Sequence, residues 1–208
     1  MVTGRELSDA WDSALAATGL PAHRPAGKAR AHVAFGAPVP AAIELEHELA
    51  DIVLTELVPR WRVRETLLPV VPAGWQLLDV HDVWLGEPPL AGQVAAADYR
   101  IVLDGADARQ IDAAAATLLG ARTLVRERTK GADRVQYDLR PLLIDVVVAS
   151  AGPPPVVRAR TRFHAALGTG RPEEVVGALG EAAGRDLAIG TIVRERLILA
   201  GELSESDR

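Results

Sequence analysis

The segment VVRARTRFHAAL (residues 156–167) alternates polar and apolar side chains with a period of two, which predicts a half-buried β-strand. One face would carry Arg158, Arg160, Arg162 and His164, and the other Val157, Ala159, Thr161 and Phe163. We call Arg158, Arg160 and Arg162 the arginine ladder. Alternate residues of a strand share a face, so these arginines would stand roughly 7 Å apart, close to the phosphate spacing of a single nucleic-acid strand.

Two interpretations of the arginine ladder remain open. It is either an anion-binding surface, widened by Arg126, Arg128, Arg194 and Arg196, or the solvated side of an ordinary sheet. In the second case, cross-strand carboxylates would pair with it, with Glu127, Glu195 and Asp145 as candidates. Nucleic-acid modules usually combine basic stripes with stacking aromatic residues, and Phe163 points away from the arginines. The pattern therefore slightly favours the structural interpretation.

Composition limits the class of protein. The chain has 208 residues, a formal net charge of −5 and no cysteine, which excludes disulfides, zinc–thiolate sites and iron–sulfur clusters built by this chain. No apolar run reaches the ~18 residues of a membrane helix, and the N-terminus lacks the pattern of a signal peptide. We therefore expect a cytoplasmic protein with no cofactor, no metal and no membrane contact.

Hydrophobic periodicity and turn residues predict an α+β fold. The chain is expected to form two tandem ferredoxin-like halves with mainly antiparallel sheets, residues 1–87 and 88–208, joined near GEPPLAG (86–92). The first half would lack its opening strand. Residues preceding Met1 would supply that strand, or another chain would, or the fold is altered. The expected elements are helices at 7–18, 58–68, 107–120 and 172–182, strands at 29–35, 48–55, 75–84, 96–103, 141–149, 156–164 and 190–199, and a hairpin of 123–129 with 133–139.

A second candidate site lies around the expected hairpin. Asp138 and Arg140 are two residues apart, and Pro141 biases Arg140 toward extended backbone. In a functional interpretation, Asp138 orients Arg140 toward an anionic ligand, beside Tyr137, with Arg128 and Lys130 across the hairpin. In a structural interpretation, which we favour somewhat, Asp138 and Arg140 form an ion pair that closes the hairpin.

Other candidate sites carry weaker signals. No two histidines have the spacing of a helical metal pair, and His47 among Glu44, Glu46 and Glu48 fits a charged strand better than a metal site. Gly168–Gly170 precedes a helix, but such a segment is more often a turn. We expect the tryptophans to pack in the core of the first half or against the second half; they are Trp11, Trp61, Trp75 and Trp84.

Several motifs resemble, in order and spacing, a bacterial radical-SAM-associated domain of unknown function. The segment RTKGADRVQYDLRPLLIDVVV (128–148) resembles its Arg-Thr-Lys, turn and Asp-Leu-Arg-Pro-Leu pattern. Further similar segments are VTGRELSDAWDSALAATGLP (2–21), ELADIVLTE (48–56), PAGWQLLDV (72–80), AADYRIVL (96–103) and GTGRPEEVVGALG (168–180). The chain departs from the pattern at 22–35, where the Pro-His-Pro of the family is lost, and it lacks the strand that usually precedes Val2. It therefore resembles a diverged member.

The resemblance implies a radical SAM protein as partner, and the usual gene context of the family implies a role linked to RNA. Our leading hypothesis is a non-enzymatic accessory domain that contacts RNA or another polyanion through the arginine ladder and the 128–140 hairpin. One alternative is an RNA-processing or RNA-modifying enzyme that uses His23 or His32. The other is an assembly module whose missing strand comes from a partner or from a second copy in a homodimer. The sequence does not identify a catalytic residue.

Overall fold

The structure is a computed structural model, and it describes residues 4–27, 31, 33–40, 42–130 and 133–207. The chain divides into two compact units. Unit 1 comprises residues 1–41 and 49–93, and unit 2 comprises residues 42–48 and 94–208. A short segment from the first half of the sequence is therefore part of the second unit.

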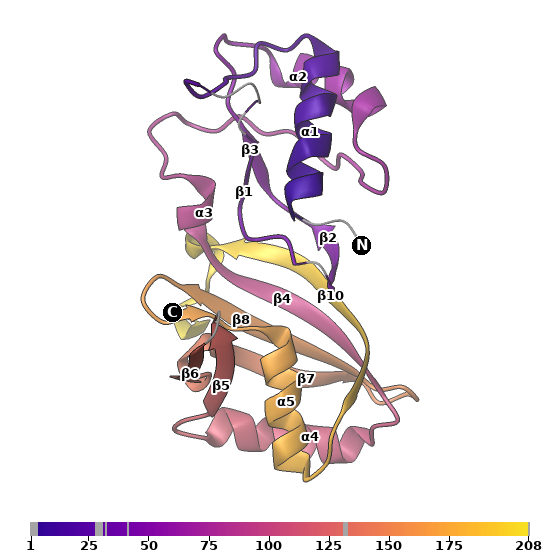
Figure 1. The fold of residues 1–208 in the computed structure, drawn as a ribbon. Helices are drawn as coiled ribbons and strands as arrows, with labels where there is room; N and C mark the ends of the chain where they lie inside the picture. The colour runs from indigo at the N-terminus through magenta and orange to yellow at the C-terminus, as the bar shows by residue number, and fades with distance from the viewer. Residues whose placement is uncertain (1–3, 28–30, 32, 41, 131–132, 208) are drawn as a thin grey trace. The chain divides into compact units, whose positions relative to one another are not determined.

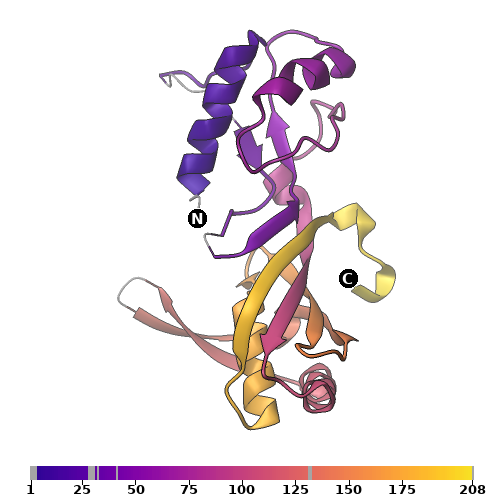
Figure 2. The same ribbon diagram turned by 90° about the vertical axis from the view of Figure 1, so that its right-hand side faces the viewer.

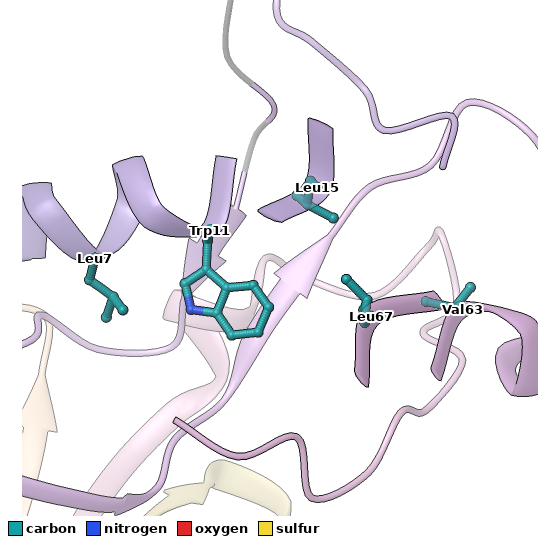
Figure 3. Close-up of a cluster of buried hydrophobic side chains, with 5 residues drawn as sticks. All are labelled: Leu7, Trp11, Leu15, Val63 and Leu67. Carbon is teal, nitrogen blue, oxygen red and sulfur yellow. The ribbon is translucent and has the colours of Figure 1, made fainter. Parts of the chain in front are cut away.

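Unit 1 is built around one long amphipathic helix. Leu7, Trp11 and Leu15 recur on one side of this helix and are buried, and Val63 and Leu67 of a second helix complete the cluster (Figure 3). Gly19, at φ 68°, follows the end of the first helix. The elements of this unit are α1 (Gly4–Thr18), β1 (Val33–Phe35), β3 (Ala50–Ile52), α2 (Arg60–Leu67), η1 (Leu68–Val70) and α3 (Leu90–Gln93).

The sheet of unit 1 is smaller than the sequence predicts. Among the described residues, β1 and β3 form an antiparallel two-stranded sheet, and residues 75–84 form no strand, so the strand predicted there is wrong. Trp75, Leu77 and Val80 nevertheless pack against the helix cluster, which explains the apolar pattern without a strand. The tandem arrangement of two ferredoxin-like halves is not confirmed.

Unit 2 contains most of the regular structure (Figure 1). Asp107 caps the N-terminus of its first helix by accepting the backbone N–H of Arg109 and of Gln110, each at 3.0 Å. Pro172 occupies the first turn of its second helix. The elements are β2 (Glu44–His47), β4 (Val94–Asp104), α4 (Ala108–Gly120), β5 (Val125–Lys130), β6 (Asp133–Asp138), η2 (Arg140–Leu142), β7 (Leu143–Ser150), β8 (Val156–His164), β9 (Gly168–Thr169), α5 (Pro172–Ala183), β10 (Ala188–Leu199), η3 (Ala200–Glu202) and η4 (Glu205–Asp207).

The main sheet has the strand order β2-β10-β4-β8-β7, with β9 paired to β8. Its pairs are antiparallel except β10 with β2, so the expectation of an α+β fold with mainly antiparallel sheets is confirmed. The helices α4 and α5 contact each other and pack on this sheet (Figure 1). The hairpin β5–β6 forms a separate two-stranded sheet that projects from the rest of unit 2 (Figure 2).

A β-bulge in β10 decides which side chains share a face. Arg194 lies opposite Tyr99 of β4, whereas Arg196 lies opposite Asp98, the residue that directly precedes Tyr99 in β4. Glu195 is the extra residue, and it breaks the alternation of the strand. Arg194 and Arg196 therefore point to opposite faces, although they are two residues apart in the sequence.

Candidate functional site

The arginine ladder lies on β8 as predicted. Val157, Ala159 and Thr161 are buried, and the arginines between them are more accessible. In the register of the sheet, Arg158 lies opposite Arg100 and Arg160 lies opposite Asp98. We call this side of the sheet the charged face; its central residues are Asp98, Arg100, Arg158, Arg160, Arg162, Glu195 and Arg196.

Glu195 joins two arginines on the charged face. Its carboxylate accepts hydrogen bonds from Nη2 of Arg158 at 3.3 Å and from Nε of Arg100 at 3.0 Å. Arg100 also pairs with Glu46 of β2. The predicted pairing with Glu195 is therefore confirmed for Arg158 of the arginine ladder. Glu195 reaches both arginines because the bulge releases it from the regular alternation of β10.

Asp98 is the second shared carboxylate. It accepts two hydrogen bonds from Arg160, at 2.7 and 3.1 Å, and one from Nε of Arg196 at 2.9 Å. Burial by itself would raise the pKa of Asp98, but the hydrogen bonds from Arg160 and Arg196 outweigh burial and hold the pKa below its ordinary value. The same contact with Asp98 raises the pKa of Arg160.

The C-terminal segment contributes to one end of the charged face. Asp207 of η4 accepts a hydrogen bond from Arg160 at 2.9 Å. Leu203 is buried with Ala96 and Ile198, in a small apolar cluster beside the charges. Two peripheral carboxylates, Glu46 and Asp207, thus add to the two central ones, Asp98 and Glu195.

Arg194 does not belong to this surface. Its guanidinium forms a bidentate pair with Glu48, with both distances 2.7 Å, and the two side chains are only 3% and 4% exposed. Tyr99 lies opposite Arg194, and burial raises the pKa of its hydroxyl, although the neighbouring guanidinium acts in the other direction. The expectation that Arg194 widens an arginine patch is wrong because the bulge turns it to the buried side.

The second candidate site has a structural geometry. Oδ1 of Asp138 accepts the backbone N–H of Leu124 at 2.7 Å and of Arg140 at 2.9 Å. The guanidinium of Arg140 donates to the carbonyl oxygens of Leu119, Ala121 and Leu143 at 2.9, 3.2 and 2.9 Å. Arg140 thus satisfies carbonyl groups at the C-terminal end of α4. The two side chains make separate contacts, so the hairpin is closed by backbone hydrogen bonds and not by the ion pair predicted for Asp138 and Arg140.

The remaining residues of the hairpin are placed only in part. Tyr137 lies on β6 opposite Arg126 of β5, and it is half-buried. The side chains of Arg128 and Lys130 lie outside the described residues. Arg126 forms ion pairs with two residues of α5: its guanidinium lies 3.4 Å from the carboxylate of Glu174 and 2.5 Å from that of Glu181. An added Cβ at Gly177 would lie 2.6 Å from Nη2 of Arg126, so the Arg126 guanidinium lies close to the backbone of α5.

The described residues include some of the candidate metal ligands and candidate catalytic histidines. No group of three or more His, Asp or Glu side chains among them is arranged to hold a metal ion. His23 is exposed in unit 1, and His32 lies outside the described residues. Nδ1 of His164 accepts backbone N–H groups from Ala166 and Leu167. None of the helices that the structure describes is long and apolar enough to cross a membrane.

Gly168–Gly170 is part of the sheet instead of an anion-binding turn. Gly168 and Thr169 form β9, and Gly170 lies so close to Leu142 and Thr161 that an added Cβ would contact the carbonyl of Leu142 at 2.7 Å. The backbone N–H of Gly170 donates to Arg162 and its carbonyl accepts from Thr161. Close packing explains the glycine at this position.

Sequence reasoning missed Asp98, which holds two arginines of the charged face. Its segment, AADYRIVL, was predicted as a strand, and Asp98 and Arg100 alternate there with buried residues. That alternation placed both residues on the polar face of the strand. Only the register of β4 with β8 identifies Arg160 as a partner of Asp98, because residues 62 positions apart meet there.

A comparison with protein families matches residues 5–175 to the family described as "Uncharacterized protein conserved in bacteria (DUF2344)". The match covers most of the chain, so this chain belongs to that family. No curated protein matches the sequence. The expectation of a bacterial family of unknown function is confirmed. The description of the family contains no link to radical SAM proteins, and that association stays a prediction.

Proposed function

We propose that this member of the DUF2344 family is a non-enzymatic accessory domain that binds an anionic partner, with RNA as the candidate, on the charged face of unit 2. Unit 2 would act as a ferredoxin-like module, because the order β10-β4-β8-β7 places the closing strand and the third strand on either side of the first. From the family resemblance, the protein served by this domain would be a radical SAM protein.

One observation carries the proposal: each central carboxylate of the charged face is shared by two arginines. Glu195 serves Arg100 and Arg158, and Asp98 serves Arg160 and Arg196. Four guanidinium groups thus surround two carboxylates, and each guanidinium has five N–H donors. The peripheral carboxylates Glu46 and Asp207 pair with Arg100 and Arg160, so the phosphate groups of a ligand would bind the other two arginines, Arg158 and Arg196.

Accessibility singles out two arginines for contact with a ligand. Arg158 and Arg196 have side chains that are 61% and 56% exposed, and each pairs with one of the central carboxylates. A phosphate could bind their outward N–H groups without breaking either pair. Arg160, at 29% exposed, is held by Asp98 and Asp207 and would serve mainly to fix the position of Asp98.

The test is a titration of a labelled RNA hairpin with the purified full-length chain at two ionic strengths. Binding through phosphates releases counterions, so the affinity should fall steeply with salt. The variant with Arg158, Arg162 and Arg196 replaced by Ala should bind more weakly, and the slope of log affinity against log salt should decrease by about 2 to 3.

A matched control removes the same charge elsewhere on unit 2. Arg109, Arg122 and Arg171 are exposed and lie away from the charged face on or beside the helices. Their triple replacement by Ala should leave the slope unchanged. Equal losses in the two triple variants would mean that net charge alone drives binding, and the proposal would fail.

A further inference from the structure

The helix α2 presents a second arginine cluster of a different kind. Its buried side is narrow, because only Val63 and Leu67 face the core of unit 1. The rest of the helix is largely exposed, and it carries Arg60, Arg62 and Arg64. Two residues of RWRVRETL therefore pack in the core, and its three arginines are exposed to solvent.

These three guanidinium groups are not neutralised by the part of the chain that the structure describes. Their side chains form no ion pair or hydrogen bond with it, in contrast to Arg100, Arg158, Arg160 and Arg196 on the charged face. Glu65 is the one acidic residue within α2. The helix itself carries three positive side chains and one negative, in a chain whose overall charge is −5.

Trp61 lies among these arginines and is 61% exposed. It does not pack in the core of unit 1, so that part of the expectation is wrong, as it is for Trp84, which is 79% exposed. On a helix, residues three and four apart are neighbours with Cβ atoms about 5–6 Å apart. Arg64 is thus next to both Trp61 and Arg60, and the three side chains form one exposed strip.

We propose that the strip Arg60–Trp61–Arg64 binds single-stranded nucleic acid, with one base stacked on the Trp61 indole and the flanking phosphates on Arg60 and Arg64. Exposed aromatic rings beside cationic side chains are the elements that bind single strands, since every base has a stacking face. The unneutralised guanidinium groups supply the charge complementarity. The arginine ladder lacks this combination of an exposed aromatic ring and arginines without carboxylate partners.

Single strands fit this surface better than the other polyanions. A duplex hides its bases and would leave the indole ring without a partner. An anionic lipid surface would need several apolar anchors, and α2 has already used its two aliphatic residues on the core of unit 1. Leu57, which is fully exposed before the helix, is the residue whose loss would reveal lipid binding.

The inference concerns the same broad ligand class as the proposed function but does not depend on it, since it uses a different unit and different residues.

The experiment measures binding of labelled oligouridylate and oligodeoxythymidylate to the full chain. Replacing Trp61 with Ala should weaken binding by about tenfold or more, because stacking of one base is lost. Trp61→Phe should retain most of the affinity, and the Arg60→Gln, Arg64→Gln variant should lose both affinity and salt dependence.

The matched control is Trp84→Ala. Trp84 is also an exposed tryptophan of the same unit, but its sequence neighbours are Asp79, Asp82 and Glu87 instead of arginines. This variant should bind the oligonucleotides as the native chain does, and so should the triple variant of the charged face. If the triple variant of the charged face loses binding of RNA hairpins but still binds oligonucleotides, the two ligands bind at two different surfaces.

Two outcomes would overturn the proposal. In the first, Trp61→Ala and Trp84→Ala have the same affinity as the native chain, or the native chain does not bind the oligonucleotides. In the second, the chain binds phosphatidylglycerol vesicles in preference to oligonucleotides, and Leu57→Ala abolishes that binding. Trp61 is exposed, so its variants should keep the native circular dichroism and unfolding midpoint, which would confirm that any loss is local.

Discussion

The two arginine-rich regions of this protein have similar sequences and different surroundings. RARTR on β8 and RWRVR on α2 each place three arginines within five residues. On β8, Arg160 meets Asp98 of the neighbouring strand β4, and Arg158 meets Glu195 of β10, the strand beyond β4. The arginines of α2 meet no carboxylate among the described residues. The difference comes from secondary structure, because a central strand has two neighbours that can supply partners and a surface helix offers mainly its own residues.

This comparison separates arginines that organise the fold from arginines that are available to a ligand. A guanidinium that already donates to a carboxylate has fewer N–H donors left for a phosphate, so its net gain on binding is smaller. A solvated guanidinium gives up only water and counterions. Counting basic residues in a sequence cannot distinguish the two cases.

The largest effect is expected at the buried arginine. Arg194→Ala would leave the carboxylate of Glu48 buried without its bidentate partner. We expect the free energy of unfolding, measured with urea, to fall by about 3–5 kcal/mol. Replacing the pair by apolar residues, as in Arg194→Met with Glu48→Leu, should recover much of that loss; equal instability of the single and double variants would contradict this account.

A smaller loss is expected at the shared carboxylate. Asp98→Ala would leave Arg160 and Arg196 without their common partner, and we expect a loss of about 1.5–3 kcal/mol, as for hydrogen bonds to charged groups. Arg158→Ala should cost less, because Arg158 is 61% exposed and Glu195 keeps Arg100. Equal losses for these two variants would remove the distinction between organising and accessible arginines on the charged face.

The pH dependence of stability provides an independent check on Asp98. Its pKa in the folded protein lies below the ordinary value of 3.8, so the carboxylate contributes stability that is fully present above that value. This contribution is lost as the pH falls through the lowered pKa. The free energies of unfolding of the native chain and of the Asp98→Asn variant, measured with urea, should therefore differ most near neutral pH. The difference should become smaller below about pH 4.

Arg140→Ala should lower the free energy of unfolding by about 1–2 kcal/mol, because the carbonyls of Leu119, Ala121 and Leu143 lose their donor. Binding of RNA hairpins and of oligonucleotides should not change. A variant that keeps its stability but loses binding would restore the functional interpretation of the hairpin.

The smallest effect on stability is expected on α2. Replacing Arg60, Arg62 and Arg64 by Gln should change the free energy of unfolding by less than about 0.5 kcal/mol at each position, since these side chains are exposed. The same substitutions should have the largest effect on oligonucleotide binding. Thermal unfolding and binding titrations on the same preparations would test both halves of this statement.

Much of unit 2 could be predicted from the sequence, and less of unit 1. The strand β8, the hairpin β5–β6 and the helices α4 and α5 have strong local patterns. Residues 75–84 have an equally strong strand pattern but form no strand. Trp75, Leu77 and Val80 pack on α1 and α2 instead, and no local pattern specifies whether an apolar face will meet a sheet or a helix.

The candidate sites show the same division. The amino-acid sequence by itself determined that the arginine ladder lies on one face of a strand, because alternation is a local property of the backbone. Tertiary structure decided that Asp98 and Glu195 hold that ladder, that a bulge removes Arg194 from it, and that Arg140 binds carbonyl groups. Register, bulges and burial depend on residues far apart in the chain, so they arise only when the strands pair.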